Sequence, residues 1–252
     1  MKKEKVCENP KLWTGLPMHH CSGCHYGIVI RLLAESLDEM GIAGKTIGIA
    51  PVGCSLGTPA HLNIDFVGAL HGRAPSVATG VKEAHYGKPI VFTIQGDGDL
   101  AAIGMGEIIN AAIRFDKLTT IFLNNANFGT TGGQLAPTTL LGQVTPTTPQ
   151  GRTPEGGGFP VHMAELMAGM KGVAYSFRGA VNSLRNFNNT KKAIKTAFQK
   201  QIDGIGYGFV EILSPCPPNW KMKPVDALKW IEEEMVKEYP LGEFKNVDEI
   251  IS

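Results

Sequence analysis

Two short apolar runs separated by one helix-length segment constrain the fold of this chain more than any other feature. The runs 90–95 (IVFTIQ) and 119–123 (TTIFL) are rich in β-branched and aromatic residues, as buried strands are. Residues 101–115 between them carry a helical pattern, and polar residues follow each run. Strand, helix and strand in this order form a crossover between parallel strands. We therefore expect an α/β fold with a doubly wound, mostly parallel sheet.

The same alternation extends over the rest of the 252 residues. Further strands are expected at 45–50, 173–177 and 208–213, and further helices at 28–40, 71–86, 162–171, 189–202 and 224–235. We predict a single domain over residues 1–252, with an N-terminal arm (1–20) and a C-terminal helical tail (219–252) as extensions. The tail helix could dock onto a partner or cover the chain's own sheet. The Gly-, Thr- and Pro-rich stretch 126–160 is too long for an ordinary loop and is expected to be functional.

Composition excludes several classes of protein. The net charge is +1, so no electrostatic footprint for nucleic acid is present. No run approaches the ~20 apolar residues that a membrane span needs. The charged N-terminus has no apolar run behind it and is not a signal peptide. We therefore expect a cytoplasmic protein that binds neither nucleic acid nor membrane, and whose cysteines are thiols or ligands rather than disulfides.

Polar residues end the two central strands. Gly96, Asp97 and Gly98 follow the first strand, and Asn124 and Asn125 follow the second. Both strand ends face the same crevice of a doubly wound sheet, where ligands bind. Each motif alone is a common turn. Together, a carboxylate and an amide oxygen on adjacent loops suit a hard cation such as Mg²⁺.

Four cysteines form a second candidate site. Cys21 and Cys24 are a Cys-x-x-Cys pair, whereas Cys54 and Cys216 each follow a predicted strand. Four thiolates hold either a [4Fe–4S] cluster or a structural Zn²⁺ ion. The spacing does not decide between them, although one pair with two distant single residues is looser than a zinc ribbon and favours iron. Cys7, in the arm, is interpreted as a plain surface thiol.

The segment GDG…NN is similar to the pyrophosphate-binding motif of thiamine-diphosphate enzymes. This resemblance implies that thiamine diphosphate binds through Mg²⁺, with the side chains of Asp97 and Asn125 and the backbone carbonyl of Asn127 as protein ligands. The diphosphate would lie against Gly98, Asp99, Gly129 and Thr130.

Both sites together resemble the β subunit of the 2-oxoacid:ferredoxin oxidoreductases. The stretches that carry the resemblance lie between residues 20 and 218: HHCSGCHYG, PVGCS, ALHGRAPSVATGVK, QGDGD, NNANFGTTGGQLAPTT and ILSPCPP. The family implies oxidative decarboxylation of a 2-oxoacid to an acyl-coenzyme A and CO₂, with electrons passing through a [4Fe–4S] cluster to ferredoxin. The cluster ligands would be Cys21, Cys24, Cys54 and Cys216.

The resemblance also implies residues that line the thiamine or the substrate: Gly53, Cys54, Ser55, His71, Gly72 and Arg73. Of these, His71 could donate to a developing oxyanion and Arg73 could pair with an anion, so both are candidate catalytic residues. The plainer interpretation is a helix-opening turn with two surface polar groups. The other histidines are interpreted as structural or surface residues: His19, His20, His25, His61, His85 and His162.

Thiamine-diphosphate enzymes bind the aminopyrimidine on a second domain that supplies an activating glutamate. This chain shows one α/β unit, so we expect an α subunit to supply that domain, and we also expect further subunits in the complex. Two alternatives stay open: a non-redox thiamine-diphosphate decarboxylase subunit with structural cysteines, and a zinc-stabilised binding module without catalysis.

The sequence gives two hints about the substrate. Relatives acting on 2-oxoglutarate often carry a lysine where Gly132 stands, which would pair with a distal carboxylate. The segment 135–143 (LAPTTLLGQ) looks like members assigned to branched-chain 2-oxoacids. We therefore favour a branched-chain 2-oxoacid, with 2-oxoglutarate and pyruvate as alternatives.

Overall fold

A seven-stranded, mostly parallel sheet forms the centre of the computed structural model, which describes residues 8–250. The strand order is β2-β1-β3-β4-β6-β5-β7, and only β7 runs antiparallel to its neighbour, β5. This confirms the predicted fold class. The strands are β1 (Thr46–Pro51), β2 (Asp65–Ala69), β3 (Ile90–Gly96), β4 (Thr119–Asn124), β5 (Val173–Ala180), β6 (Tyr207–Leu213) and β7 (Gly242–Asn246).

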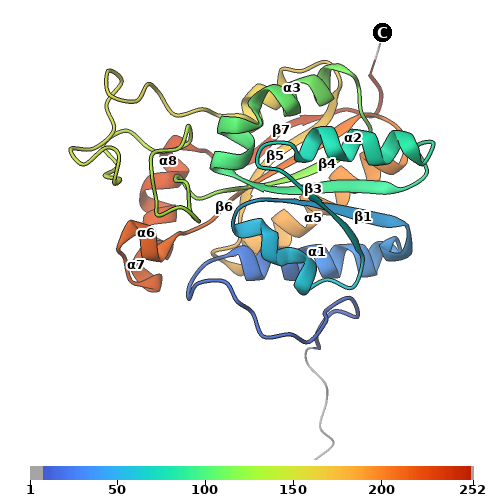
Figure 1. Cartoon of the computed structure of the whole chain (residues 1–252), viewed down its shortest axis with the longest axis horizontal. Coiled ribbons are helices and arrows are strands. Elements are labelled where there is room, and N and C mark those ends of the chain that lie inside the picture. Colours follow the sequence, from blue (N-terminus) through green and yellow to red (C-terminus); the bar gives the residue numbers. More distant parts are fainter. Residues whose placement is uncertain (1–7, 251–252) are drawn as a thin grey trace, which may run out of the picture.

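Helices cover both faces of the sheet, with α1 and α5 on one face and α2, α3 and α4 on the other (Figure 1). Their bounds, with the short 3₁₀ (η1, η2) and π (η3, η4) segments, are α1 (Tyr26–Met40), η1 (Ala43–Lys45), η2 (Cys54–Ala60), α2 (Ala74–Ala84), η3 (Gly98–Ile103), α3 (Met105–Ile113), α4 (Met163–Ala168), α5 (Leu184–Ile202), α6 (Pro217–Trp220), α7 (Pro224–Trp230), η4 (Ile231–Met235) and α8 (Val236–Glu238).

Alternating side chains on the central strands build one core on each face. Phe92 and Ile94 of β3 pack in the cluster that contains α1 and α5, whereas Val91 packs in the cluster that contains α2 and α3. Strands buried on both faces read as continuous apolar runs, which is why 90–95 and 119–123 were recognisable in the sequence. The two central strands are therefore rigid supports for whatever follows their carboxyl ends.

The two edge strands, β2 and β7, were not predicted. β2 is largely exposed and contains Asp65 and Gly68, which are poor strand formers. β7 (GEFKN) is short, polar and partly exposed, as edge strands commonly are. Their pairing comes from the neighbouring strand rather than from their own sequence. The tail 219–252 is consequently not helical throughout.

Two helix boundaries also differ from the prediction. The helix expected at 189–202 begins earlier, because the Ser183 hydroxyl accepts a hydrogen bond from the Asn186 N–H and caps it. The helix expected over 101–115 is divided at Gly104 into the π-helical segment η3 and the α-helix α3.

The C-terminal helices pack on this chain itself. Ile231 and Met235 are fully buried in a small core with Leu140, Ala180 and Leu213. Of the two interpretations of the tail helix, covering its own fold is the one observed. Within the described range, 8–250, no helix is long and apolar enough to cross a membrane. Cys7 lies outside the described residues.

Candidate cofactor and metal-binding site

The carboxylate of Asp97 collects hydrogen bonds from three segments at the carboxyl edge of the sheet. Asp97 follows β3 and is fully buried. Its Oδ1 accepts the N–H of Asn125, which follows β4, at 3.0 Å. Its Oδ2 accepts the N–H of Asn127 at 3.2 Å and the hydroxyl of Thr138 at 2.6 Å. The two predicted motifs and the long loop therefore meet at one side chain.

A left-handed residue shapes the Asn-Asn loop. Ala126, which is buried, has a φ of 56°, a conformation that costs free energy for residues other than glycine. The side chain of Asn124 stabilises this conformation of Ala126. Oδ1 of Asn124 accepts the Ala126 N–H at 3.1 Å, and Nδ2 of Asn124 donates to Glu211 at 2.7 Å. The reversal lets the amides on both sides of Ala126 point at the same carboxylate.

Two oxygens of this edge suit a cation. The Oδ1 of Asn125 is buried and has no hydrogen-bond partner in the described part of the chain. Burial raises the pKa of Asp97 to about 7, although the bonds from Thr138 and the two amides oppose that rise. A buried carboxylate of this kind is stabilised in its charged form by a bound cation. Asp97 and Asn125 thus provide the oxygen ligands that Mg²⁺ prefers.

Asp99 orients His71. One carboxylate oxygen of Asp99 accepts the Gly72 N–H at 2.6 Å and lies 2.6 Å from Nδ1 of His71, while the other accepts the Gln95 amide at 2.5 Å. The carboxylate fixes the proton of His71 on Nδ1, so Nε2 carries a lone pair. The Asp99 side chain is therefore engaged inside the protein, and only its backbone is available to a diphosphate.

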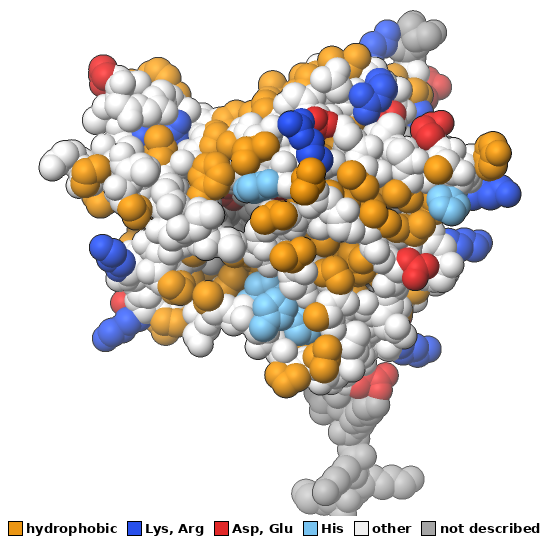
Figure 2. All heavy atoms as spheres, in the orientation of Figure 1, with side chains coloured by type: hydrophobic (Ala, Val, Ile, Leu, Met, Phe, Trp, Pro, Cys, Tyr) orange, Lys and Arg blue, Asp and Glu red, His pale blue; other side chains and the backbone are white. Residues whose placement is uncertain are grey.

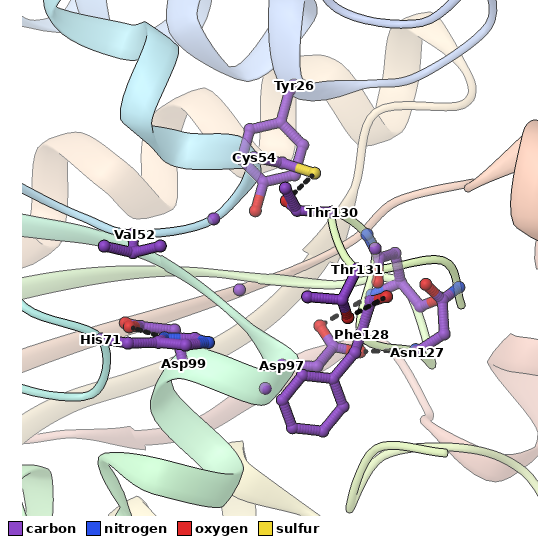
Figure 3. A pocket seen from close by; sticks show the side chains of 15 residues that line it. Tyr26, Val52, Cys54, His71, Asp97, Asp99, Asn127, Phe128, Thr130 and Thr131 are labelled. Atoms are coloured by element: carbon purple, nitrogen blue, oxygen red, sulfur yellow. Dashed lines mark hydrogen bonds and ion pairs between the residues drawn. The ribbon is translucent and has the colours of Figure 1, made fainter. Parts of the chain in front are cut away.

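A pocket opens over these residues (Figure 3). Cys54 and Tyr26 lie on one side of it, Asp97 and Asn127 lie on another, and His71 stands at its edge. Most of the predicted cofactor residues line this pocket: Gly53, Cys54, His71, Asp97, Gly98, Asp99, Asn125, Asn127, Gly129 and Thr130.

Three predicted residues do not line the pocket. Arg73 is 53% exposed, and its guanidinium pairs with Glu107 of α3. Gly72 contributes only the N–H that holds Asp99. Ser55 is buried with its hydroxyl unpartnered, outside the lining.

The four predicted cysteines line one cavity, although they come from four segments. Cys21 and Cys24 precede α1, Cys54 begins η2, and Cys216 is the residue before α6. Burial, with a smaller contribution from the charges of the other three cysteines, raises the pKa of Cys24 to about 12. Burial likewise raises the pKa of Cys54 and Cys216. Such thiols deprotonate when a metal binds them.

The oxygen-lined pocket and the sulfur-lined cavity share a wall. Five residues line both of them: Gly53, Cys54, Asn125, Gly129 and Thr130. At Gly129 a β-carbon would lie 3.2 Å from Cys54 Sγ, so glycine lets the two loops approach closely. The Cys54 Sγ lies 3.1 Å from the Thr130 hydroxyl. The site is therefore one double pocket.

Several residues that build the site were not predicted. Thr138 lies in the stretch NNANFGTTGGQLAPTT but was assigned no role there, and the hydroxyl of Tyr239, a residue outside every motif, donates to the Thr138 carbonyl at 2.5 Å. The buried guanidinium of Arg152 donates to backbone carbonyls of the long loop, among them those of Pro137 (3.0 Å) and Phe159 (2.8 Å). The unusual length of the 126–160 loop was a signal for Thr138 and Arg152, whereas nothing in the sequence pointed to Tyr239.

Comparison with protein families places the fold in a class. Residues 50–211 match the family described as thiamine pyrophosphate enzyme, C-terminal TPP binding domain. This range contains the Asp97 and Asn125 loops, and it covers more than half of the chain. The domain is thus of the thiamine-diphosphate-binding type.

Individual relatives narrow the class. The ketoisovalerate oxidoreductase subunit VorA of Methanothermobacter marburgensis is 42% identical over 228 residues, which are 90% of this chain and 48% of the relative. The 2-oxoglutarate synthase subunit KorB of Archaeoglobus fulgidus is 36% identical over 220 residues, which are 86% of this chain and 77% of that protein. The chain spans about half the length of the ketoisovalerate relatives. It belongs to the 2-oxoacid:ferredoxin oxidoreductase family, among the subunits that carry the thiamine-diphosphate-binding domain.

A solved structure shows the same fold. The 2-oxoglutarate:ferredoxin oxidoreductase from Magnetococcus marinus, determined with 2-oxoglutarate, coenzyme A and succinyl-CoA bound, superposes with a TM-score of 0.75. The match covers 98% of this chain and 87% of that chain at 23% sequence identity.

Proposed function

We propose that this chain is the thiamine-diphosphate- and [4Fe–4S]-binding subunit of an enzyme that oxidatively decarboxylates a 2-oxoacid to an acyl-coenzyme A and CO₂. The observation that carries the proposal is the wall shared by the oxygen-lined pocket and the sulfur-lined cavity. Thiamine diphosphate bound in the first pocket would therefore lie next to a [4Fe–4S] cluster bound in the second.

The oxygen-lined pocket fits a magnesium diphosphate. The unpartnered Asn125 Oδ1 and the buried Asp97 carboxylate are two hard ligands on fixed supports. The predicted third ligand is the carbonyl of Asn127, whose N–H already donates to Asp97. Gly98 and Gly129 line the same pocket and leave backbone accessible to phosphate oxygens. Thiamine diphosphate would then provide the electron sink for decarboxylation, and the cluster would take up the electrons.

His71 is the chain's candidate for proton handling near the substrate. Its Nδ1 is held by Asp99, and its ring meets Phe128 edge to face with centroids 6.5 Å apart. We infer that Nε2 of His71 faces the substrate and the thiamine, and that it hydrogen-bonds to them or transfers a proton. Arg73, engaged with Glu107, is assigned no such role.

The cysteine cavity fits a cluster better than a single zinc ion. A tetrahedral Zn²⁺ with Zn–S bonds of ~2.3 Å holds its four sulfurs about 3.8 Å apart. In residues 8–250, the group of three or more metal-binding side chains whose donor atoms lie within 4.8 Å of one another contains no cysteine. Sulfurs that line one cavity at wider spacing suit a larger, multi-iron centre.

The pocket lining favours an apolar acyl group. Among the described residues that line it, none is Lys or Arg, and the apolar side chains include Val52 and Phe128. The second carboxylate of 2-oxoglutarate would have no cation to pair with there. The higher identity to ketoisovalerate oxidoreductases than to 2-oxoglutarate synthases points the same way. We propose a branched-chain 2-oxoacid as substrate.

The remaining parts of the enzyme are proposed from the family. A pyrimidine-binding domain, supplied by an α subunit, would provide the activating glutamate, and ferredoxin would receive the electrons. Further subunits would complete the complex. We propose that it works in the cytoplasm, where the thiols stay reduced until iron binds them.

The test is activity of the complex, purified without oxygen, against 2-oxoisovalerate, 2-oxoglutarate and pyruvate. Coenzyme A is present, and a viologen dye or ferredoxin is the acceptor. We expect acyl-coenzyme A formation coupled to acceptor reduction, fastest with 2-oxoisovalerate. Decarboxylation without acceptor reduction, in a protein that contains zinc instead of iron, would support the non-redox alternative.

A further inference from the structure

Three histidines beside the cysteine cavity form a cluster that the function above does not use. His19 and His20 belong to the N-terminal arm, and His61 follows η2. One ring nitrogen of each lies within 4.8 Å of those of the other two. Figure 2 shows histidine side chains gathered on the lower half of the visible face. No sequence pattern groups these residues, because 42 positions separate His19 from His61.

The spacing of the rings matches that of metal-bound imidazoles. The ring centroids are 4.4 Å apart for His19 and His20, 4.8 Å for His19 and His61, and 6.3 Å for His20 and His61. With metal–nitrogen bonds of 2.0–2.1 Å, a tetrahedral ion holds ring centroids roughly 5 Å apart. The three rings therefore need only small movements to share one ion.

His61 is buried and presents one ring nitrogen to His19. Its side chain is 1% exposed and stacks on Trp13, with centroids 5.3 Å apart. Its Nε2 lies 2.7 Å from Nδ1 of His19, so these two nitrogens share one proton, whereas Nδ1 of His61 has no hydrogen-bond partner among residues 8–250. An ion shared with His19 would therefore bind His61 through Nε2, the nitrogen that faces His19. Binding a metal ion gives the shared lone pairs a stronger acceptor than a single proton.

His20 has one ring nitrogen next to a backbone carbonyl and the other next to a thioether sulfur. Its Nε2 lies 3.0 Å from the carbonyl oxygen of Cys54, and its Nδ1 lies 3.0 Å from the Met18 sulfur. A carbonyl offers no proton, so the neutral ring donates from Nε2 and carries its lone pair on Nδ1. A thioether does not donate either. Imidazole nitrogen and thioether sulfur facing each other are both ligands of late transition metals.

We propose that His19, His20 and His61 bind one late first-row transition-metal ion, with Zn²⁺ as its probe and the Met18 sulfur beside the site. The donors are nitrogen and sulfur, with no carboxylate in the group, which excludes Mg²⁺ and Ca²⁺ as the preferred ions. The 2.7 Å pair of His19 and His61 would open to about 3.4 Å, the separation of ligands on a tetrahedral ion.

The ion would tie two cysteine loops together. His20 directly precedes Cys21, and His61 closes the segment η2 that Cys54 begins. A shared ion would therefore fix the arm against η2 and hold these two cysteines at a constant distance. This inference does not depend on the proposed function.

The test uses the full chain, purified without oxygen and loaded with its cluster. After a chelator has removed adventitious metal, the protein is equilibrated with Zn²⁺, and zinc and iron are counted per chain. We expect one zinc with unchanged iron. His61→Phe keeps an aromatic ring beside Trp13 but removes both nitrogens, so zinc affinity should fall at least about tenfold. His85→Ala, an exposed histidine outside the cluster, is the matched control and should bind zinc like the wild type.

A thermal scan separates loss of the ligand from loss of the fold. Without zinc, the wild type and His61→Phe should melt alike; with zinc, only the wild type should melt at a higher temperature. The proposal is overturned if the wild type binds no zinc, if zinc enters only as iron leaves, or if His61→Phe and His19→Gln bind zinc as tightly as the wild type. Iron content and thiamine-diphosphate binding, measured on the same samples, report the proposed function separately.

Discussion

The two halves of the double pocket are built in opposite ways. The oxygen-lined half sits on the ends of β3 and β4, and its central carboxylate is held by backbone amides and a hydroxyl. The sulfur-lined half is assembled from the arm, η2 and the segment before α6, and two of its sulfurs contact polar side chains outside the sheet: Cys54 contacts Thr130, and Cys216 accepts from Asn219. The difference teaches that the fold preforms the first half, whereas the geometry of the second half would depend on the metal centre proposed to bind there.

The largest effect is expected at the preformed half. Asp97→Ala removes the charged ligand, so magnesium-dependent binding of thiamine diphosphate should weaken by at least about two orders of magnitude. Isothermal titration with and without Mg²⁺ measures this. Iron content should stay at the wild-type value, because the cysteines do not depend on this carboxylate. Wild-type cofactor affinity in the variant would remove Asp97 from the ligand set.

A substitution of one cysteine tests the sulfur-lined half. Cys216→Ser should lose or convert the cluster, which iron analysis and the visible spectrum report. Thiamine-diphosphate affinity should change by less than about threefold, since Cys216 does not line the oxygen pocket. Cys7→Ser, outside the predicted ligand set, is the control and should keep its iron. Unchanged iron in Cys216→Ser would exclude this residue as a ligand.

Thr138 tests how much the hydrogen bonds around Asp97 contribute. Thr138→Val removes the hydroxyl that donates to Oδ2, so magnesium-dependent cofactor affinity should fall by roughly 10-fold. Thr138→Ser keeps the hydroxyl and should bind like the wild type. Equal loss in both variants would show that packing of the threonine methyl, rather than the hydrogen bond, matters.

The pH dependence of magnesium binding follows from Asp97. Burial raises its pKa to about 7, so in the metal-free protein a proton competes with Mg²⁺ below that pH. Affinity should be constant above pH 7 and fall by about tenfold for each unit below it. The sign for stability is opposite: without metal, the raised pKa makes the folded state less stable as the pH rises from about 4 to 7. A magnesium affinity that does not change between pH 5.5 and 7 would contradict this assignment.

The sequence predicted the central strands and the metal loop at their ends, but it did not predict the edge strands or the side chains that support the loop. Ile90–Gly96 and Thr119–Asn124 were recognisable because strands buried on both faces are continuously apolar, and their polar ends located the metal loop. The edge strands β2 and β7 were missed because tertiary pairing, not local propensity, forms them. The roles of Thr138, Arg152 and Tyr239 were missed because they exist only once the long loop has folded: Thr138 donates to Asp97, and the other two bond to backbone carbonyls of the loop.

The central claim is that electrons pass directly from the thiamine pocket to the cysteine cavity. The measurement is electron paramagnetic resonance of the whole complex, frozen at intervals after a 2-oxoacid is added with no external acceptor. We predict that the signal of a reduced [4Fe–4S] cluster appears in the wild type and is absent in Asp97→Ala samples with full iron content. Release of CO₂ at the wild-type rate while the cluster stays oxidised would contradict the account.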